Sequence, residues 1–351
     1  MNPLAALLAQ LEKTQWQKRS IPTLKGPILT REALQTMQAP PGAFVTKTSG
    51  STGIPVQVQR TRLSGLWHSA TNIREILWHK RDISQSFATI RPQIEREIFQ
   101  PDWGPAFSLL GKSGPLYAHP VEGDLNRWLQ KIQPGYLLTY PSILESIDLT
   151  KLTRLKGIKT TGETLLQRHP LIADMYSAEE VGTIAIQCPD NPEVYHVMEN
   201  ILLEILSENN TPCKAGKVVL TDTTSPYLHR YEIGDYAEFS ECHCGRGLQT
   251  IGKILGRRRN KVRLPDGSEH WPRIGSPEYR SIAPVKQFQV AQIEKTVLEL
   301  RLLIDARLTE AQETAFRKLI QTKIGYPFEI RIVYVDAFPR GKFEEFINLV
   351  K

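Results

Sequence analysis

The sequence has 351 residues, of which 40% are apolar and 23% charged, a composition typical of a globular protein with enough chain for two or three domains. No run of about 18 apolar residues occurs, which excludes a transmembrane helix on length. The net charge of +7 permits nucleic-acid binding, but Lys and Arg are scattered apart from a cluster at 257–263, so an anionic small substrate is favoured and nucleic acid is not expected.

The N-terminal segment predicts an arm that packs on a larger body. Residues 1–42 are polar and punctuated by prolines, and 3–9 predict a short amphipathic helix rather than a signal peptide, because no basic front or cleavage site accompanies them. Four cysteines in a chain of this size do not make a secreted disulfide framework. We therefore expect a cytoplasmic protein without a membrane partner.

A hydroxyl-rich loop follows, with the sequence Thr48-Ser49-Gly50-Ser51-Thr52-Gly53. It lies between the apolar residues 43–45 and the alternating residues 56–59, a strand, turn and strand pattern. Glycines let backbone N–H groups approach an anion closely, so phosphate is a candidate ligand. A solvated loop is the alternative, and the missing Lys after Gly53 argues against a nucleotide P-loop.

The next hundred residues alternate between helical and strand-like patterns. This alternation predicts an α/β body with a mainly parallel sheet. Ser142 follows a strand and is a candidate N-cap of the helix after it. The helical segments are 64–80, 125–132 and 143–149, and the strand-like segments are 87–90 and 136–140.

Two further strands each lead to a turn with a carboxylate. Residues 155–161 precede Gly162-Glu163, and residues 171–175 precede the turn 176–182, which contains Glu180. Ligands of open parallel sheets collect at the carboxyl ends of the strands, and an acidic turn there could hold Mg²⁺.

A smaller, more twisted sheet is predicted from the strands 200–206 and 217–221. Asp235 then lies in a glycine turn and could accept hydrogen bonds from a ribose diol, although a plain surface turn is the alternative.

A change to the basic stretch 256–261 marks a domain boundary. Beyond it we expect a compact α+β module with strands at 297–304 and 328–335 and a helix at 310–324. The sequence therefore predicts two domains, 1–256 and 257–351.

Six motifs occur in one order along the chain: TSGSTG, GE, Y-x-x-x-E, R-Y-x-x-G-D, G-R and a near-terminal G-K. This set resembles the adenylate-forming (acyl-CoA synthetase-like) superfamily, in particular the branch of phenylacetate–coenzyme A ligase and capsule-biosynthesis adenylating proteins. The resemblance implies a large α/β domain with mainly parallel sheets and a smaller twisted sheet, followed by a small mobile α+β domain. It implies an AMP-forming ligase that uses ATP to convert a carboxylic acid, aromatic in this branch, into an acyl-adenylate and then a thioester of coenzyme A.

Several alternatives stay open. The acyl group could pass to a carrier protein or another nucleophile, or the chain could be a non-catalytic nucleotide-binding homologue. Oligomeric state is open as well, with a homodimer as one alternative.

The resemblance also implies roles for single residues. It assigns Thr48 to Gly53 to the β- and γ-phosphates of ATP, Gly162, Glu163 and Tyr176 to adenine, Glu180 to Mg²⁺, Asp235 and Arg257 to the ribose, and Lys342 to the α-phosphate and the attacking carboxylate. Ser177 and Glu179 depart from the usual Gly and Thr or Ser, so Glu179 either alters metal binding or faces elsewhere. Arg259 and Asn260 replace the acidic residues that are usual at the domain hinge.

A second metal site is suggested by Cys188, His196, Cys242 and Cys244. Three thiols and an imidazole make a complete tetrahedral set for structural zinc, and buried cysteines without a ligand are the alternative. Some members of the resembled branch carry zinc at matching positions, so the resemblance implies structural Zn²⁺ here. Cys213 is left outside the set.

Overall fold

The computed structural model describes residues 2–20, 22–37, 44–47, 57–165, 169–257, 260–272, 279, 281–338 and 346–350. The chain divides into two compact units. Unit 1 contains residues 1–140, 149–162 and 169–255, and unit 2 contains 141–148, 163–168 and 256–351. No helix in the described ranges is long and apolar enough to cross a membrane.

Unit 1 is organised around one twelve-stranded sheet, with strand order β11-β12-β13-β14-β10-β9-β8-β7-β6-β3-β5-β4. Its first half in sequence contains β3 (Phe87–Ile90), β4 (Ile98–Gln100), β5 (Leu116–His119), β6 (Tyr136–Thr139), β7 (Gly157–Thr161) and β8 (Ile172–Ala178). The other strands are β9 (Gly182–Gln187), β10 (Tyr195–Val197), β11 (Ile201–Leu206), β12 (Ala215–Asp222), β13 (Tyr231–Phe239) and β14 (Thr250–Arg257). A separate hairpin pairs β1 (Phe44–Lys47) with β2 (Gln57–Arg60).

The direction of pairing changes at β8. All neighbours in the series β5-β3-β6-β7-β8 pair in parallel. Strand β8 pairs with β9 antiparallel. The predicted α/β fold class is confirmed. The strands predicted as a smaller sheet, now β11 and β12, are present and antiparallel, and the sheet continues through β13, β14, β10 and β9 to the parallel half.

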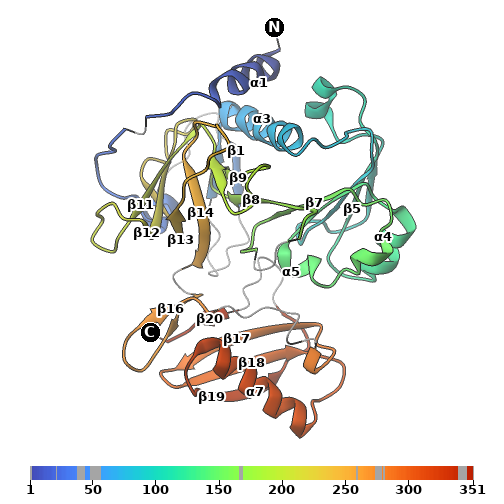
Figure 1. The fold of residues 1–351 in the computed structure, drawn as a ribbon, viewed down its shortest axis with the longest axis vertical. Helices are drawn as coiled ribbons and strands as arrows, with labels where there is room; N and C mark the ends of the chain where they lie inside the picture. The colour runs from blue at the N-terminus through green and yellow to red at the C-terminus, as the bar shows by residue number, and fades with distance from the viewer. Residues whose placement is uncertain are drawn as a thin grey trace. The chain divides into compact units, whose positions relative to one another are not determined.

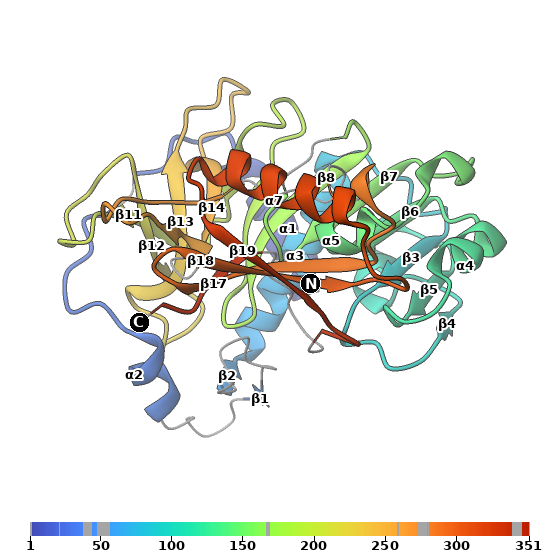
Figure 2. The ribbon, with the colours of Figure 1, turned by 90° about the horizontal axis from the view of Figure 1, so that it is seen from below.

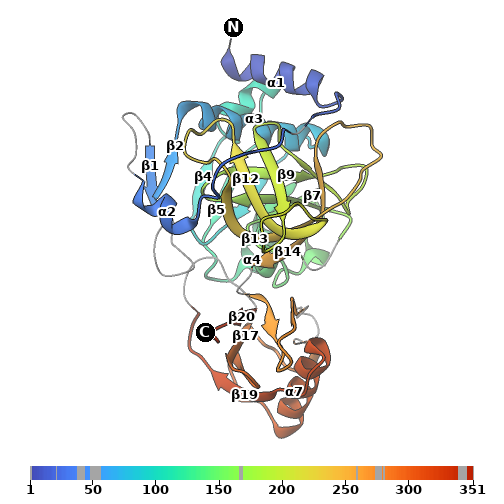
Figure 3. The same ribbon diagram turned by 90° about the vertical axis from the view of Figure 1, so that its left-hand side faces the viewer.

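Helices of unit 1 cover this sheet. They are α1 (Pro3–Thr14), α2 (Arg31–Thr36), α3 (Arg62–Trp78) and α4 (Leu125–Ile132), with short 3₁₀ turns at Pro105–Leu110 and Leu149–Lys151. Helix α3 lies against β9 and carries α1 on its outer side (Figures 1 and 3). It begins where Thr61 and Ser64 form a reciprocal capping box, which satisfies two N–H groups at the helix start.

Unit 2 contains a four-stranded sheet of order β19-β18-β17-β20 and the helix α7 (Glu310–Ile324), which lies over one face of the sheet (Figure 2). The strands of this sheet are β17 (Gln287–Glu294), β18 (Val297–Leu303), β19 (Glu329–Tyr334) and β20 (Phe346–Asn348), and a separate two-stranded sheet pairs β15 (Val262–Arg263) with β16 (Glu269–His270). Helix α7 buries Phe316, Ile320 and Ile324 at a spacing of four residues, which places them on the face toward the core.

The predicted helix at 143–149 is wrong in its bounds. The observed helix α5 covers only Pro141–Leu144, so Ser142 lies inside its first turn and is not an N-cap. Pro141 explains the early start, because its ring presets a helical φ and it needs no N–H partner at the first helical position.

A buried network of charges ties α3 to β7. Arg81 donates two hydrogen bonds to Oε1 of Glu75, at 2.9 and 2.7 Å, and Nζ of Lys159 lies 3.6 Å from Oε2 of Glu75. Lys159 also donates to Oδ1 of Asn72 at 3.0 Å. Burial alone raises the pKa of Glu75, but Lys159 and Arg81 outweigh it and lower that pKa to about 2.

This network predicts a specific loss of stability in acid. Because the folded-state pKa of Glu75 lies below its ordinary value of 4.5, ionised Glu75 stabilises the fold above about pH 4.5, and this contribution is lost as the pH falls toward 2. Glu75→Gln leaves two cations without their carboxylate and should cost about 3–5 kcal/mol at neutral pH. Urea unfolding between pH 2 and 7 measures both effects, and Glu95→Gln at an exposed position is the control. Equal stability of Glu75→Gln and wild type at pH 7 would contradict the prediction.

Candidate functional site

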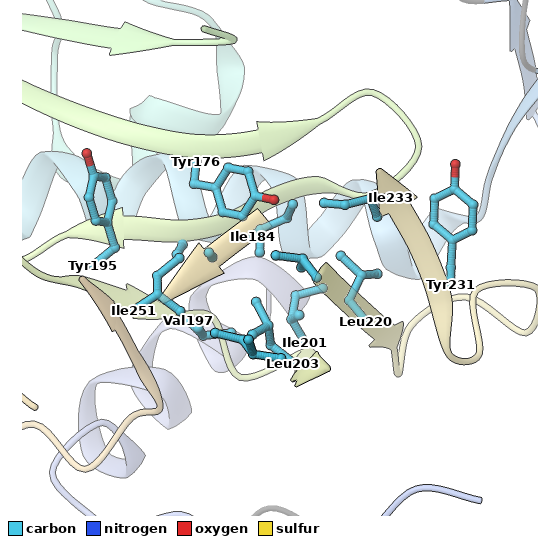
Figure 4. Packing of buried hydrophobic residues seen from close by; sticks show 14 of the residues in the cluster. Tyr176, Ile184, Tyr195, Val197, Ile201, Leu203, Leu220, Tyr231, Ile233 and Ile251 are labelled. Atoms are coloured by element: carbon cyan, nitrogen blue, oxygen red, sulfur yellow. The ribbon is translucent and has the colours of Figure 1, made fainter. Parts of the chain in front are cut away.

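Two of the predicted nucleotide-binding residues meet in unit 1. Tyr176 on β8 donates its hydroxyl proton to Oδ2 of Asp235 on β13, at 2.9 Å. Both residues are buried, with 6% and 8% of their surface exposed. Tyr176 belongs to the apolar core cluster between the strands, near Ile184 and Ile233 (Figure 4). The predicted adenine and ribose residues are therefore linked directly, although they are distant in sequence.

Glu180 lies in the turn between β8 and β9. Its Oε1 accepts a hydrogen bond from the Tyr231 hydroxyl at 3.2 Å and lies 3.6 Å from Nη1 of Arg31. The side chain of Glu180 is 11% exposed, whereas Glu179 is exposed, and its carbonyl oxygen accepts a hydrogen bond from Arg60 at 3.3 Å. The two adjacent residues therefore differ in exposure, and the alternative roles of Glu179 stay predictions.

Gly162 directly follows β7 and has a backbone conformation that favours glycine. Its φ is +86°, and a Cβ atom placed on it would lie 3.1 Å from the ring of Tyr140. Both the left-handed backbone and the adjacent ring disfavour any larger residue here. The turn after β7 therefore brings its backbone close to the ring of Tyr140.

Glu163 and Arg257 belong to unit 2. Glu163 accepts the backbone N–H of Ser142 at its Oε2, at 3.0 Å, and the carbonyl oxygen of Arg257 accepts a hydrogen bond from Nε1 of Trp271, also at 3.0 Å. The predicted phosphate loop, Thr48 to Gly53, and Lys342 lie outside the described residues.

Sequence reasoning missed three residues around these sites: Arg31, Tyr231 and Arg246. Tyr231 lies inside the R-Y-x-x-G-D motif and Arg246 directly follows Cys-His-Cys-Gly, so both could have been found as motif neighbours. Arg31 has no such signal, because only the folded chain brings it to Glu180.

The four predicted metal ligands converge. The ligand atoms of Cys188, His196, Cys242 and Cys244 all lie within 4.8 Å of one another. Sγ of Cys242 is 3.7 Å from Sγ of Cys188, and Sγ of Cys244 is 3.3 Å from Nε2 of His196. Zn–S bonds of about 2.3 Å in a tetrahedron separate two sulfur atoms by about 3.8 Å, so this donor set fits zinc. Cys213 lies outside the cluster, and its thiol donates instead to the carbonyl oxygen of Ala215.

The surroundings of the cluster suit a cation. Burial and nearby Arg246 lower the pKa of His196 to about 4, so its imidazole is neutral and can donate a lone pair at pH 7. Burial raises the pKa of Cys188 to about 12. At Cys244 burial also raises the pKa, but hydrogen bonds from Arg246 outweigh this effect and the net shift is downward. A bound cation would favour the thiolate form of all three cysteines.

Arg246 forms a second layer around the cluster. Its guanidinium pairs with Asp190 at 2.6 Å, lies 3.9 Å from Sγ of Cys188, and stands over the rings of Trp16 and Trp78 at 5.2 and 4.8 Å from their centroids. A tetrahedral Zn²⁺ with three thiolates carries one net negative charge, which this buried guanidinium would balance.

The N-terminal segment clamps the same loop. The N–H of Gly247 donates to the carbonyl oxygen of Gln15 at 2.7 Å, and the N–H of Arg19 donates to the carbonyl oxygen of Gly247 at 3.0 Å. A Cβ atom on Gly247 would lie 2.1 Å from the carbonyl oxygen of Gln17, so only glycine fits.

We expect Cys242→Ser to abolish stoichiometric zinc binding, because the serine hydroxyl is a poor zinc ligand and the tetrahedral set loses one donor. Metal analysis of the purified protein measures this, with an expected change from about one zinc per chain to near zero. Cys213→Ser is the matched control and should keep its zinc. Equal zinc content in both variants would exclude a role of Cys242 as a ligand.

No family model matches the sequence, and a comparison with curated proteins gives no match. Solved structures do resemble it. A 2-hydroxyisobutyryl-CoA ligase in the postadenylation state with 2-HIB-AMP aligns with a TM-score of 0.67 and 16% identity, over 98% of this chain and 88% of that chain. Its complex with R3-HIB-AMP gives 0.65 and 17%, over 93% and 80%.

An anthranilate-CoA ligase in complex with anthranoyl-AMP gives a TM-score of 0.58 and 13% identity, over 85% of this chain and 64% of that chain. The phenylacetate–coenzyme A ligase branch stays a prediction. At the level of the fold, the resemblance read from the motifs is confirmed: this chain has the fold of the adenylate-forming CoA ligases.

Proposed function

We propose that the protein is an AMP-forming ligase, which activates a carboxylic acid with ATP and then makes a thioester with coenzyme A. The observation that carries this proposal is the Tyr176–Asp235 hydrogen bond with Glu180 in the turn after β8. These residues match the adenine, ribose and Mg²⁺ positions of the resembled superfamily. Structures with the same fold include complexes with acyl-adenylates and with coenzyme A.

Two steps follow from this chemistry. A carboxylate oxygen of the acid attacks the α-phosphorus of ATP and pyrophosphate leaves; the thiol of coenzyme A then attacks the acyl carbon, and AMP leaves. The first step brings two anions together, so cations and oriented donors must stabilise the charge that develops. Mg²⁺, held by Glu180, would supply one cation and Lys342 the other, while Thr48 to Gly53 would bind the leaving pyrophosphate.

The domain roles are part of the proposal. Residues 1–256 would hold ATP and the acid, with Gly162 and Glu163 at the adenine, and Arg257, the first residue of the second domain, would contact the ribose. Residues 257–351 would move as a domain and carry Lys342 to and from the α-phosphate. The Cys₃His cluster would hold structural zinc, and four cysteines outside any disulfide favour a reducing compartment, the cytoplasm.

Two candidates remain for the acid. The branch resemblance favours an aromatic acid. A hydroxy acid is the second candidate, because one structure of the same fold is a 2-hydroxyisobutyryl-CoA ligase in complex with 2-HIB-AMP. Pyrophosphate release across a panel of aryl, hydroxy, fatty and amino acids separates the two. If no acid in the panel causes release of pyrophosphate, a non-catalytic nucleotide-binding protein is favoured.

The acceptor is tested in the same assay. Coenzyme A and a carrier protein bearing phosphopantetheine are offered in turn with ATP and the preferred acid. We expect coenzyme A to release AMP fastest. A structure of the same fold contains a peptidyl carrier domain, so preference for the carrier protein is the alternative outcome.

We expect Lys342→Ala to slow acid-dependent pyrophosphate release by about 10²–10³-fold, because the developing charge loses a cation in a desolvated site. Lys318→Ala, an exposed lysine of α7, is the control in the same unit and should retain the wild-type rate. An unchanged adenylation rate in Lys342→Ala would show that the assigned role is wrong.

Tyr176→Phe removes the hydroxyl that donates to Asp235. We expect the KM for ATP to rise about five- to tenfold, since one buried hydrogen bond contributes about 1 kcal/mol. Tyr195→Phe is a matched control, because it removes a similar buried hydrogen bond, 2.8 Å to Asp174, away from the proposed ribose site. If both variants change the KM equally, the effect belongs to general stability rather than to Asp235.

A further inference from the structure

The N-terminal arm is anchored to the strand that carries Asp235. The N–H of Leu29 donates to the carbonyl oxygen of Arg230 at 2.9 Å, and the N–H of Glu232 donates to the carbonyl oxygen of Leu29 at 3.0 Å. Arg230 also donates from Nη1 to the carbonyl oxygen of Gly26 at 2.6 Å. Through the two backbone bonds, Leu29 of the arm forms an isolated parallel β-bridge with Tyr231 of β13.

The same contacts orient helix α2. Thr30 caps it by accepting the N–H of Ala33, and Leu34 is buried in the core cluster of the antiparallel strands. With its start capped and its apolar face packed, α2 holds its first residue, Arg31, in a fixed place. Arg31 is 22% exposed and lies 3.6 Å from Glu180.

Both contacts of Glu180 fall on one oxygen. The Tyr231 hydroxyl and the Arg31 guanidinium approach Oε1, and no described residue donates a hydrogen bond to Oε2. A carboxylate held in this way presents its second oxygen in a defined direction, which suits a hard divalent cation. Partners that orient a metal-binding carboxylate commonly change metal affinity or activity by about 10- to 100-fold when they are removed.

A purely structural role for the Arg31–Glu180 ion pair explains this geometry less completely. This pair is largely buried, so it also contributes to the stability of the fold. Tyr231 beside it is fully buried and already ties β13 to the turn of Glu180 without the arginine. The guanidinium therefore adds charge and direction at one carboxylate oxygen in addition to its contribution to the fold.

We propose that Arg31 is a positioning residue for Glu180, so that the N-terminal arm forms part of the site for the divalent cation that accompanies ATP. Arg31 holds Oε1 and leaves Oε2 to the cation. This inference rests on the proposed function, in which Glu180 binds Mg²⁺.

Binding measurements test the proposal without turnover. Mn²⁺ replaces Mg²⁺ as a paramagnetic probe, and electron paramagnetic resonance gives its dissociation constant in the presence of ATP. Calorimetry gives the dissociation constant of ATP alone in a chelator. For Arg31→Ala we expect Mn²⁺ to bind about tenfold more weakly in the ATP complex, while metal-free ATP affinity changes less than about twofold.

Three comparisons make the result specific. Arg31→Lys should recover part of the Mn²⁺ affinity because it keeps the cation, whereas Arg31→Met, of similar length without charge, should not. Arg154→Ala, an exposed arginine of the same unit, should match wild type. Thermal unfolding of each variant checks that the fold is intact.

Three outcomes would overturn the proposal. Wild-type Mn²⁺ affinity in Arg31→Ala excludes positioning. Equal weakening of metal-bound and metal-free ATP indicates a direct contact with the nucleotide or a structural role. If wild type itself fails to bind ATP, the proposed function is wrong and the inference falls with it, a result distinct from the first two.

Discussion

The structure of unit 1 depends on β8 having a partner on each of its edges. Strand β7 pairs with it in parallel and β9 pairs with it antiparallel, so the backbone groups of β8 are satisfied on both sides although the sheet changes direction there. The parallel half delivers Gly162 and Ser177 at its carboxyl edge. The antiparallel half contributes Asp235 and Tyr231. Because β8 joins the two halves, Tyr176 can reach Asp235 and Glu180 can reach Tyr231.

Two buried charged groups of unit 1 have partners of opposite charge. Glu75 pairs with Arg81 and Lys159, and Arg246 pairs with Asp190 beside the cysteines. A charge removed from water destabilises a fold unless a partner of opposite sign accompanies it. Helix α3 lies between these two sets, since Glu75 faces β7 while Trp78 contacts both His196 and Arg246. A single helix therefore supports two regions of different chemistry.

The sequence predicts the local elements well where their ends carry clear signals. Helix α7 has the predicted bounds, since Thr309 caps its start and Gly325 ends it in a left-handed conformation. Local patterns do not predict pairing between segments that are distant in sequence. Strand β10 pairs with β14 and so joins the two parts of the large sheet, and no periodicity in the sequence indicates this pairing. The same distinction explains which residues of the candidate site could be predicted from the sequence. Tyr176, Glu180 and Asp235 stand in motifs and could be named, but the contact of Arg31 with Glu180 arises only from the docking of the arm on β13.

The clamp between Gly247 and the segment at Gln15 to Arg19 has a consequence for synthesis of the chain. The segment 15–19 that follows α1 is synthesised well before its hydrogen-bonding partner Gly247, which lies near the end of unit 1 in sequence. Helix α1 packs on α3, which is close to it in sequence, so α1 can dock before Gly247 is present. The two backbone hydrogen bonds that tie the N-terminal segment to the cysteine loop therefore form only after nearly all of unit 1 has been synthesised.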